Sequence, residues 1–393
     1  MKLFLRSFDN PAALLALVVA VLMTLGIVMV YSASGARAGL ENIRVAAKSE
    51  GRAEEDYRFN HGTNYVTKQI TWGVLGLVIA LAAMRVPLEA LEKYSGVALV
   101  ACLIVLVLVI ATPLGHSAGG SRRWIRMGPL SLQPSEFAKI ALVIFMARFL
   151  TAKRQQMRSF MRGFLPAVGV VGLFSVLIMK EDLGTIVLMG GVIMAMWCLA
   201  HVRMMHLASI GLAAVPVLIL LVLQHSYRQN RILAFLDPEK YALTHAFQLN
   251  QSLIAVGSGG VFGLGMGDGL QKYHFLGESH TDFIFGIVCE ELGMVGGISV
   301  CLLFTAFVIL GLRISYRAPD YFSGLLAAGL TMIVGLAAFI NFFVALGLAP
   351  TKGLALPFFS YGGSAMMASL VCVGLLVNIA NASLKSVGAR EVF

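Results

Sequence analysis

The sequence predicts an all-α polytopic membrane protein, and its composition, its apolar runs and the placement of its basic residues each support this. Of the 393 residues, 58% are hydrophobic and only 13% are charged, whereas soluble domains carry about one-quarter charged residues. The mean hydropathy is +0.84. We therefore expect most of the chain to lie in lipid, as a single integral membrane domain over residues 1–393.

Ten apolar segments approach the length of about 20 residues that a helix needs to cross a bilayer core. They lie near residues 12–33, 66–85, 95–112, 136–151, 164–179, 184–200, 206–224, 282–312, 322–348 and 363–384. The first follows Lys2 and Arg6 and precedes Ala36-Arg37-Ala38, which imitates a secretory signal and its cleavage site. Its apolar run is longer than a signal peptide needs, so we expect a retained helix.

The net charge of +10 does not indicate a nucleic-acid partner, because the basic residues are spread over short loops between apolar runs. With ten spans and both termini in the cytoplasm, the inner loops and the tails collect basic residues, as the positive-inside rule requires. The inner loops and tails then carry Lys2, Arg6, Arg85, Lys93, Lys153, Arg154, Arg158, Arg162, Arg203, Arg313, Arg317, Lys385 and Arg390.

The loop over residues 113–135 departs from this rule, because the same topology places it outside although it contains Arg122, Arg123 and Arg126. One interpretation is that these arginines pair with lipid headgroups or other loops, with Trp124 as an interfacial anchor. The other is a receptor for a phosphorylated lipid, since a guanidinium group binds two phosphate oxygens at once.

The fourth span is expected to begin near Pro134, in the run Gln133-Pro134-Ser135-Glu136. Proline suits the first helical turn, and a glutamate there favours the positive end of the helix dipole. Lys139 follows about one turn later. It either forms a local ion pair with Glu136 that protects an intramembrane charge, or it faces an outer cavity and holds phosphate.

A large extracytoplasmic loop over residues 225–281 separates the seventh and eighth spans. It contains aromatic and apolar residues, so we expect amphipathic helices or re-entrant segments at the membrane surface. Its glycine-rich stretch, residues 257–269, does not predict a nucleotide site, because no strand precedes it and no GK[ST] follows. The glycines instead favour sharp bends and close approach to a ligand or helix.

Asp282 ends this loop at the mouth of the eighth span. A carboxylate beside hydrophobic walls has a raised proton affinity and can accept a proton from a hydroxyl group. The alternative is that Asp282 caps the helix, and residue spacing does not separate the two. Glu290 and Glu291 follow about 12 Å deeper by helical rise, where we expect them to face a partner inside the protein.

Seven motifs, in order along the chain, resemble the SEDS family (FtsW, RodA and SpoVE) of peptidoglycan polymerases. They are Gly120-Ser121-Arg122-Arg123-Trp124-Ile125, Gln133-Pro134-Ser135-Glu136-Phe137-Ala138-Lys139, Asp182-Leu183-Gly184-Thr185, Phe235-Leu236-Asp237-Pro238, Gln251-Ser252-Leu253-Ile254-Ala255, His280-Thr281-Asp282-Phe283-Ile284-Phe285 and Pro357-Phe358-Phe359-Ser360-Tyr361-Gly362-Gly363-Ser364. The last motif and Pro350-Thr351-Lys352-Gly353 are more similar to the division member FtsW or its sporulation relative than to the elongation member RodA.

The resemblance implies a peptidoglycan glycosyltransferase of the inner membrane that polymerises lipid II during septal synthesis. It places the family's essential aspartate at Asp282, as the base for an inverting transfer that releases undecaprenyl pyrophosphate. Candidate residues for binding substrate or pyrophosphate are Arg122, Arg123, Arg126, Lys139, Lys352, Glu136, Gln251, Ser252, His280 and Thr281. A divalent cation, Mg²⁺ or Mn²⁺, is an additional candidate.

The resemblance also implies partners: lipid II, a class B penicillin-binding protein transpeptidase, other divisome proteins and membrane lipids. A lipid II flippase is the first alternative function. Transporters often show internal repeats with a midplane site, whereas we find no convincing repeat here and the charged candidates cluster at one face. A non-catalytic division scaffold is the second alternative, and it would not need Asp282.

Overall fold

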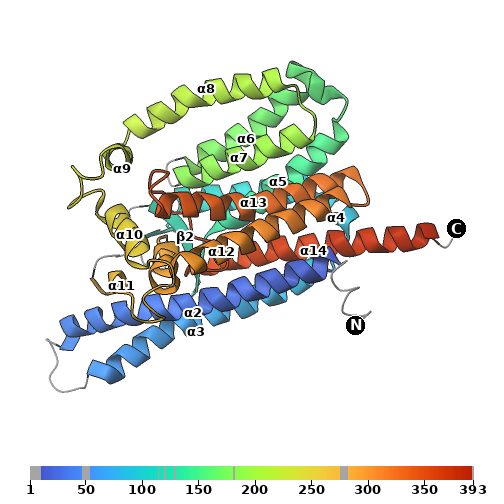
Figure 1. Cartoon of the computed structure of the whole chain (residues 1–393). Helices are drawn as coiled ribbons and strands as arrows, with labels where there is room; N and C mark the ends of the chain where they lie inside the picture. Colours follow the sequence, from blue (N-terminus) through green and yellow to red (C-terminus); the bar gives the residue numbers. More distant parts are fainter. Residues whose placement is uncertain are drawn as a thin grey trace.

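The computed structural model describes residues 10–46, 54–113, 115–118, 121–127, 130–179, 182–274 and 282–391. All ten predicted segments are helical. Their observed bounds are α2 Pro11–Ala46, α3 Glu54–Ala83, α4 Leu88–Ala111, α5 Pro134–Ala152, α6 Leu165–Ile178, α7 Leu183–Leu199, α8 Met204–Leu223, α12 Ile284–Tyr316, α13 Tyr321–Ala345 and α14 Gly363–Glu391. Figure 1 shows most of these helices running along a common direction, with the start of α2 and the end of α14 at the same end.

Within the described residues, eight helical stretches are long and apolar enough to cross a membrane, which confirms the predicted polytopic membrane fold. Seven lie within α2, α3, α4, α8, α12, α13 and α14, and the eighth, Phe160–Ile178, joins α6 to the π-helical turn Phe160–Phe164 that precedes it. Helices α5 and α7 do not meet these criteria, each for an identifiable reason. Helix α7 has only 17 residues, and α5 carries Glu136, Lys139 and Arg148 within 19 residues. Helix α5 begins at Pro134, as predicted, and most of its residues are buried, so neighbouring helices shield its charges.

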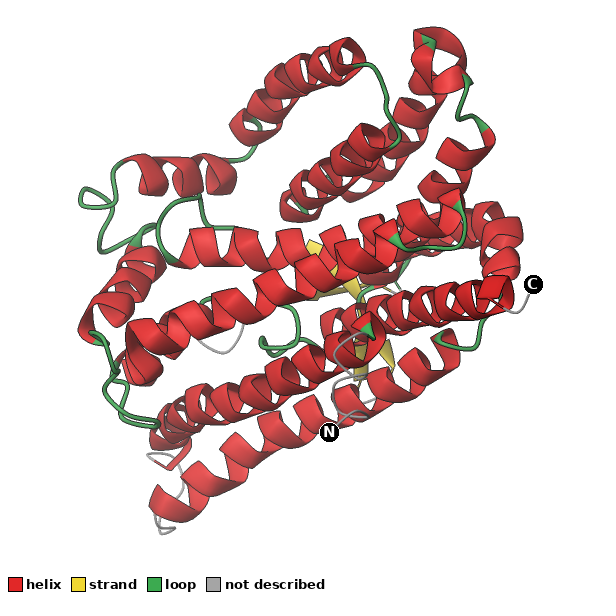
Figure 2. Ribbon diagram, turned by 45° about the vertical axis from the view of Figure 1, so that its right-hand side comes forward, coloured by secondary structure: helices red, strands yellow, loops and turns green. Residues whose placement is uncertain are grey.

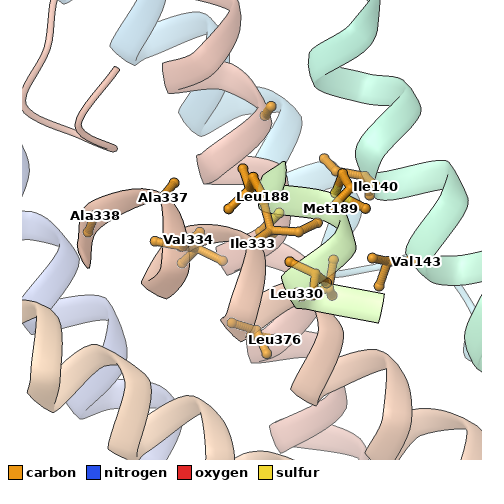
Figure 3. Packing of buried hydrophobic residues seen from close by; sticks show 14 of the residues in the cluster. Ile140, Val143, Leu188, Met189, Leu330, Ile333, Val334, Ala337, Ala338 and Leu376 are labelled. Atoms are coloured by element: carbon orange, nitrogen blue, oxygen red, sulfur yellow. The ribbon is translucent and has the colours of Figure 1, made fainter. Parts of the chain in front are cut away.

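The core lies around α13, which packs against α5, α7, α12 and α14. In Figure 3, Ile140 and Val143 of α5, Leu188 and Met189 of α7, and Leu376 of α14 meet the α13 face. In the most apolar stretches of α13 and α14, 78% of the residues are buried, whereas only 11% are buried in that of α8. Helices α13 and α14 are therefore central, and α8 lies at the periphery.

The 113–135 segment differs from the expected irregular loop. Gly115–Ala118 (β1), Ser121–Met127 (β2) and Leu130–Leu132 (β3) form an antiparallel sheet in the order β1-β2-β3, seen among the helices in Figure 2. Trp124 pairs with His116, and Ile125 pairs with both Gly115 and Leu132. The strands are short and carry charges, so their periodicity is too weak to stand out from a loop in the sequence.

The described part of the large loop, residues 225–274, contains three helices, α9 Ser226–Leu236, α10 Phe247–Ser258 and α11 Gln271–His274, as expected of helical segments there. Its glycine-rich stretch meets a break in α12 at Gly293, where φ is 69°. Four backbone bonds fill the break: Leu264 N–H to Glu290 O, Gly265 N–H to Glu291 O, Met294 N–H to Gly260 O and Val295 N–H to Val261 O. The predicted close approach to a helix is therefore observed.

Glu290 and Glu291 lie just before this break, both 1% exposed. Glu291 accepts from Lys272 Nζ at 2.6 Å and from Ser32 Oγ at 2.6 Å. Glu290 Oε1 accepts from the backbone N–H groups of Leu270 and Gln271. The expectation that these carboxylates face partners inside the protein is correct, and they tie α12 to α2 and to the large loop.

Candidate active site

A polar cavity of about 280 Å³ opens where the N-terminal ends of α5, α7, α12 and α14 converge. We call this the cavity end of the bundle. The opposite end, where α2 begins and α14 finishes, we call the tail end (Figure 1). The charged residues that line the cavity are Arg123, Glu136, Lys139, Asp182 and Asp282. Apolar side chains of α13 form part of the wall, including Ile333 and Val334.

Asp282 occupies the turn immediately before α12, and its position is fixed through its backbone. The side-chain amide of Asn341, on α13, donates to the Asp282 carbonyl oxygen and to the Leu354 carbonyl oxygen, both at 2.8 Å. A Cβ atom at Gly353 would lie 3.3 Å from Asp282 Oδ2, so this glycine leaves room beside the carboxylate. The N-cap residue of α12 is Phe283, one position after Asp282.

Lys139 and Glu136 form a buried ion pair on the cavity wall. Lys139 Nζ lies 2.9 Å from Glu136 Oε1 and 2.8 Å from Oε2. The two side chains are 6% and 13% exposed. The two interpretations of Lys139 are therefore compatible, because the same ammonium group both pairs with Glu136 and faces the cavity.

Arg123 and Asp182 form a second, looser pair at the cavity edge, with 3.6 Å between Nη1 and Oδ2. Asp182 also caps α7, accepting from the backbone N–H and the hydroxyl of Thr185 at 2.9 Å each. Arg123 Nε is buried without a hydrogen-bond partner among the described residues. Both charged residues also line an apolar recess with Val109 and Ile178, so the pair lies between the cavity and this recess.

Helix ends and a phenol group add hydrogen-bond donors to a cavity whose charged side chains are two cations and three carboxylates. The N-terminal ends of α5, α7 and α14 lie at its wall, and such ends carry partial positive charge that favours anions. Burial raises the pKa of Tyr361, with a further contribution from the neighbouring Tyr65 phenol. Tyr361 therefore remains protonated at neutral pH and can donate a hydrogen bond.

Four predicted binding residues lie outside the cavity lining. Arg126 is exposed and pairs with Ser131 in the sheet. Lys352 is half-buried beside Gly353, and burial lowers its pKa. Gln251 and Ser252 belong to α10, and Ser252 is fully buried.

Ser252 has a packing role in this structure. Its hydroxyl donates to the carbonyl of Ala345, at the end of α13, at 2.9 Å, and it fits against Gly286 of α12. The prediction that Ser252 contacts substrate therefore finds no support in its position. His280, Thr281 and the side chain of Arg122 lie outside the described residues.

Two residues were not recognised as site residues from the sequence, although each carries a signal: Asp182, which lines the cavity, and Asn341, which binds the Asp282 backbone. Asp182 interrupts an apolar run three residues before Thr185, a spacing typical of an N-cap. Asn341 is a lone amide within the apolar α13 and is 2% exposed. A buried polar side chain in a span needs a partner, but only the folded chain shows that this partner is the Asp282 backbone.

The donor set does not match a resident divalent cation. No group of three histidine, cysteine, aspartate or glutamate side chains comes together among the described residues. Of the three carboxylates lining the cavity, Glu136 and Asp182 are each paired with a cation. The Mg²⁺ or Mn²⁺ candidate remains a prediction, and we derive no step through it.

The fold and the site together define a multi-pass membrane protein with a polar cavity at one end of its helix bundle. The model of the FtsW/RodA/SpoVE family, described as cell cycle proteins, matches residues 12–385. The chain belongs to this family, as the sequence motifs predicted.

Two relatives illustrate the similarity. Stage V sporulation protein E of Bacillus subtilis is 38% identical over 375 residues, covering 95% of this chain and 98% of the relative. A probable peptidoglycan glycosyltransferase FtsW of Geobacter metallireducens is 38% identical over 379 residues, covering 96% of each. The names of the FtsW relatives support the predicted enzyme class.

Solved structures agree on the fold. A chain from a structure on the coordination of polymerization and crosslinking by a peptidoglycan synthase complex has a TM-score of 0.73 and 26% identity, and the match covers 94% of this chain and 97% of that one. Thermus thermophilus RodA has a TM-score of 0.65 at 24% identity, covering 93% and 95%. The second similarity is evidence for the fold alone.

Proposed function

We propose that this chain is a peptidoglycan glycosyltransferase that polymerises lipid II at the outer face of the cytoplasmic membrane during septal synthesis. The observation that carries the proposal is that Asp282 lines the same cavity as the cations Arg123 and Lys139. A glycosyl transfer from a lipid pyrophosphate needs a base and cationic groups near one another, and this cavity supplies both.

In the proposed reaction, Asp282 takes the proton from the 4-hydroxyl of the acceptor N-acetylglucosamine. That oxygen attacks C1 of the N-acetylmuramic acid at the end of the growing strand and forms the new glycosidic bond with inversion. The bond from C1 to the pyrophosphate oxygen breaks, and its electron pair leaves with undecaprenyl pyrophosphate. The single base and direct displacement account for the inverting outcome.

Arg123 and Lys139 are suited to the charge that develops on the leaving pyrophosphate. Their existing partners, Asp182 and Glu136, hold the two cations in place before substrate arrives, and fixed charges stabilise a transition state without reorganisation. The unused Nε–H of Arg123 offers a further donor. The apolar recess that shares Arg123 and Asp182 supports a substrate that carries a lipid chain.

The proposed orientation puts the cavity end outside and the tail end in the cytoplasm. The basic loops that connect the helices at the tail end, and the basic tails, are favoured on the cytoplasmic side by the positive-inside rule. A class B penicillin-binding protein is the proposed partner, with other divisome proteins. The similarity to a chain of a peptidoglycan synthase complex supports a partner that crosslinks.

The test is glycan-strand formation from purified lipid II, with and without the class B partner, by wild type and Asp282→Asn. We expect strands from wild type and none from Asp282→Asn, while expression and partner binding stay unchanged. An active Asp282→Asn variant would overturn the role of Asp282. No strands from wild type under any partner or cation condition would favour the flippase or scaffold instead.

A further inference from the structure

Helix α9 lies in the large loop and does not line the cavity, yet it contacts segments that do. Its two arginines, Arg228 and Arg231, are three residues apart and therefore share one face of the helix. Both donate to backbone carbonyl groups of distant segments. Carbonyl partners of this kind fix the backbone of the segment that carries them.

Arg228 joins the ends of two helices. Its Nη1 donates to the Leu221 carbonyl, in the last turn of α8, at 3.1 Å. Its Nη2 donates to the Met179 carbonyl, at the C-cap of α6, at 2.6 Å. Helix C-termini carry unpaired carbonyls and partial negative charge, so a forked cation suits this position. The Asp182 N–H donates to the carbonyl of Ile178, the residue before Met179, at 2.9 Å, and Asp182 pairs with Arg123 at the cavity.

Arg231 reaches the other side of the cavity. Its Nη1 donates to the Thr351 carbonyl at 3.1 Å, and its guanidinium group lies over the ring of Tyr227, with 4.5 Å to the centroid. Thr351 stands two residues before Gly353, which leaves the space beside Asp282 Oδ2. Leu354 follows, and its carbonyl shares the Asn341 amide with Asp282.

We infer that α9 is a brace that sets the spacing between the two sides of the cavity, and that Arg228 and Arg231 are positioning residues. Arg228 fixes the segment carrying Asp182, and with it Arg123. Arg231 fixes the segment packed beside Asp282. The base and a leaving-group cation are thus held at a set separation through one short helix. Displacements of about 1 Å can cost a hundredfold in rate.

The inference concerns the proposed polymerase reaction and rests on it, so the experiment has one readout that depends on activity and one that does not. Full-length Arg228→Ala, Arg231→Ala and Gln229→Ala are compared with wild type. Gln229 is the matched control, because its amide donates from the same helix to the Leu223 carbonyl at 2.7 Å. Within the described part of the chain, the Gln229 side chain donates no hydrogen bond to either cavity segment.

The first readout is amide hydrogen exchange. We expect Arg228→Ala to raise exchange in residues 182–188 and Arg231→Ala to raise it in residues 351–356, each selectively, while Gln229→Ala leaves both unchanged. Unchanged exchange in both segments, or the same rise in the control, would contradict the proposed role of α9 in holding these segments. This result stands whether or not any variant makes glycan strands.

The second readout is strand formation from lipid II. We expect Arg228→Ala and Arg231→Ala each to lower kcat about tenfold, which corresponds to the free energy of one charge-assisted hydrogen bond. KM for lipid II should change less than about twofold, because the cavity donors remain. Arg231→Lys should recover activity, since one ammonium can reach one carbonyl, whereas Arg228→Lys should recover less because it must bridge two. Wild-type kcat in both alanine variants would overturn the positioning role. Absence of strands from wild type would refute the polymerase proposal instead.

Discussion

At the residue scale, the cavity contains two kinds of ion pair. One joins residues that are close in the sequence, and the other joins residues that only the fold brings together. Glu136 and Lys139 are three residues apart, so their pairing follows from a helical turn. Arg123 and Asp182 are far apart in sequence and meet because β2 and the start of α7 reach the same wall. Each cation therefore has a carboxylate that holds it in place.

The Glu136–Lys139 pair gives a stability prediction with an internal control. Lys139→Met leaves the Glu136 carboxylate uncompensated and should destabilise the protein by about 3 to 5 kcal/mol. The double variant Glu136→Gln/Lys139→Met should recover much of that loss, because no unpaired charge stays buried. Thermal unfolding in detergent measures both.

Activity separates the two roles of this pair. The double variant should remain inactive in strand formation even where its stability recovers, since the cavity still lacks the ammonium group. Full activity of the double variant would show that Lys139 serves only to balance Glu136.

Lys352 gives a pH prediction. Burial lowers its pKa below the ordinary value of 10.5, so the unfolded chain binds more protons than the folded chain between the two pKa values. Stability should therefore rise with pH across that window. Relative to wild type, the Lys352→Met variant should gain the most stability at neutral pH, and this gain in stability should shrink as the pH approaches 10.5. Melting temperatures of both proteins over this range test it, and parallel curves would contradict it.

At the element scale, the broken helix α12 depends on the glycine-rich stretch that fills its gap. The sequence indicated bends and a close approach, but the partner and the four backbone bonds became visible only in the structure. The same applies to the 113–135 segment, which the sequence predicted as a loop. Its short antiparallel pairs bring Arg123 to the cavity wall.

Gly263 tests this junction. Its φ is +85°, and a Cβ atom would lie 2.1 Å from the Glu291 carbonyl oxygen. Gly263→Ala should destabilise the protein by at least the roughly 1 to 3 kcal/mol of a strained backbone position. Gly257→Ala is the control, because nothing lies within 4 Å of its Cβ position and alanine favours the helical backbone of α10. Equal melting temperatures for the two variants would contradict the proposed junction.

At the scale of the whole molecule, the ends of the bundle differ in character. The cavity end carries the small sheet and the cavity. At the tail end, the loops are joined by contacts such as Arg154 over the Tyr321 ring at 4.2 Å and Ser383 Oγ with the Arg317 carbonyl. The proposed topology rests on the basic loops at the tail end, which the positive-inside rule favours in the cytoplasm.

Cysteine labelling in a cysteine-free background tests the orientation. Ser131→Cys, exposed at the cavity end, should react with an impermeant maleimide on intact spheroplasts. Gln155→Cys, exposed at the tail end, should react only after the membrane is opened. The reverse pattern would place the cavity in the cytoplasm and would contradict polymerisation at the outer face.

The sequence by itself determined the membrane class, the positions of all ten helical segments and the family. These properties depend on local composition and ordered motifs, which do not require knowledge of contacts. It also indicated Arg123, Lys139, Glu136 and Asp282 as candidates, all of which line the cavity.

Only the tertiary structure decided which candidates meet and what holds them. It left Ser252 in a packing contact, brought Asp182 to Arg123, and joined Asn341 to the Asp282 backbone. The physical reason is that these contacts link residues 59 to 93 positions apart in the sequence. Such pairings depend on how helices and strands pack rather than on the period of either.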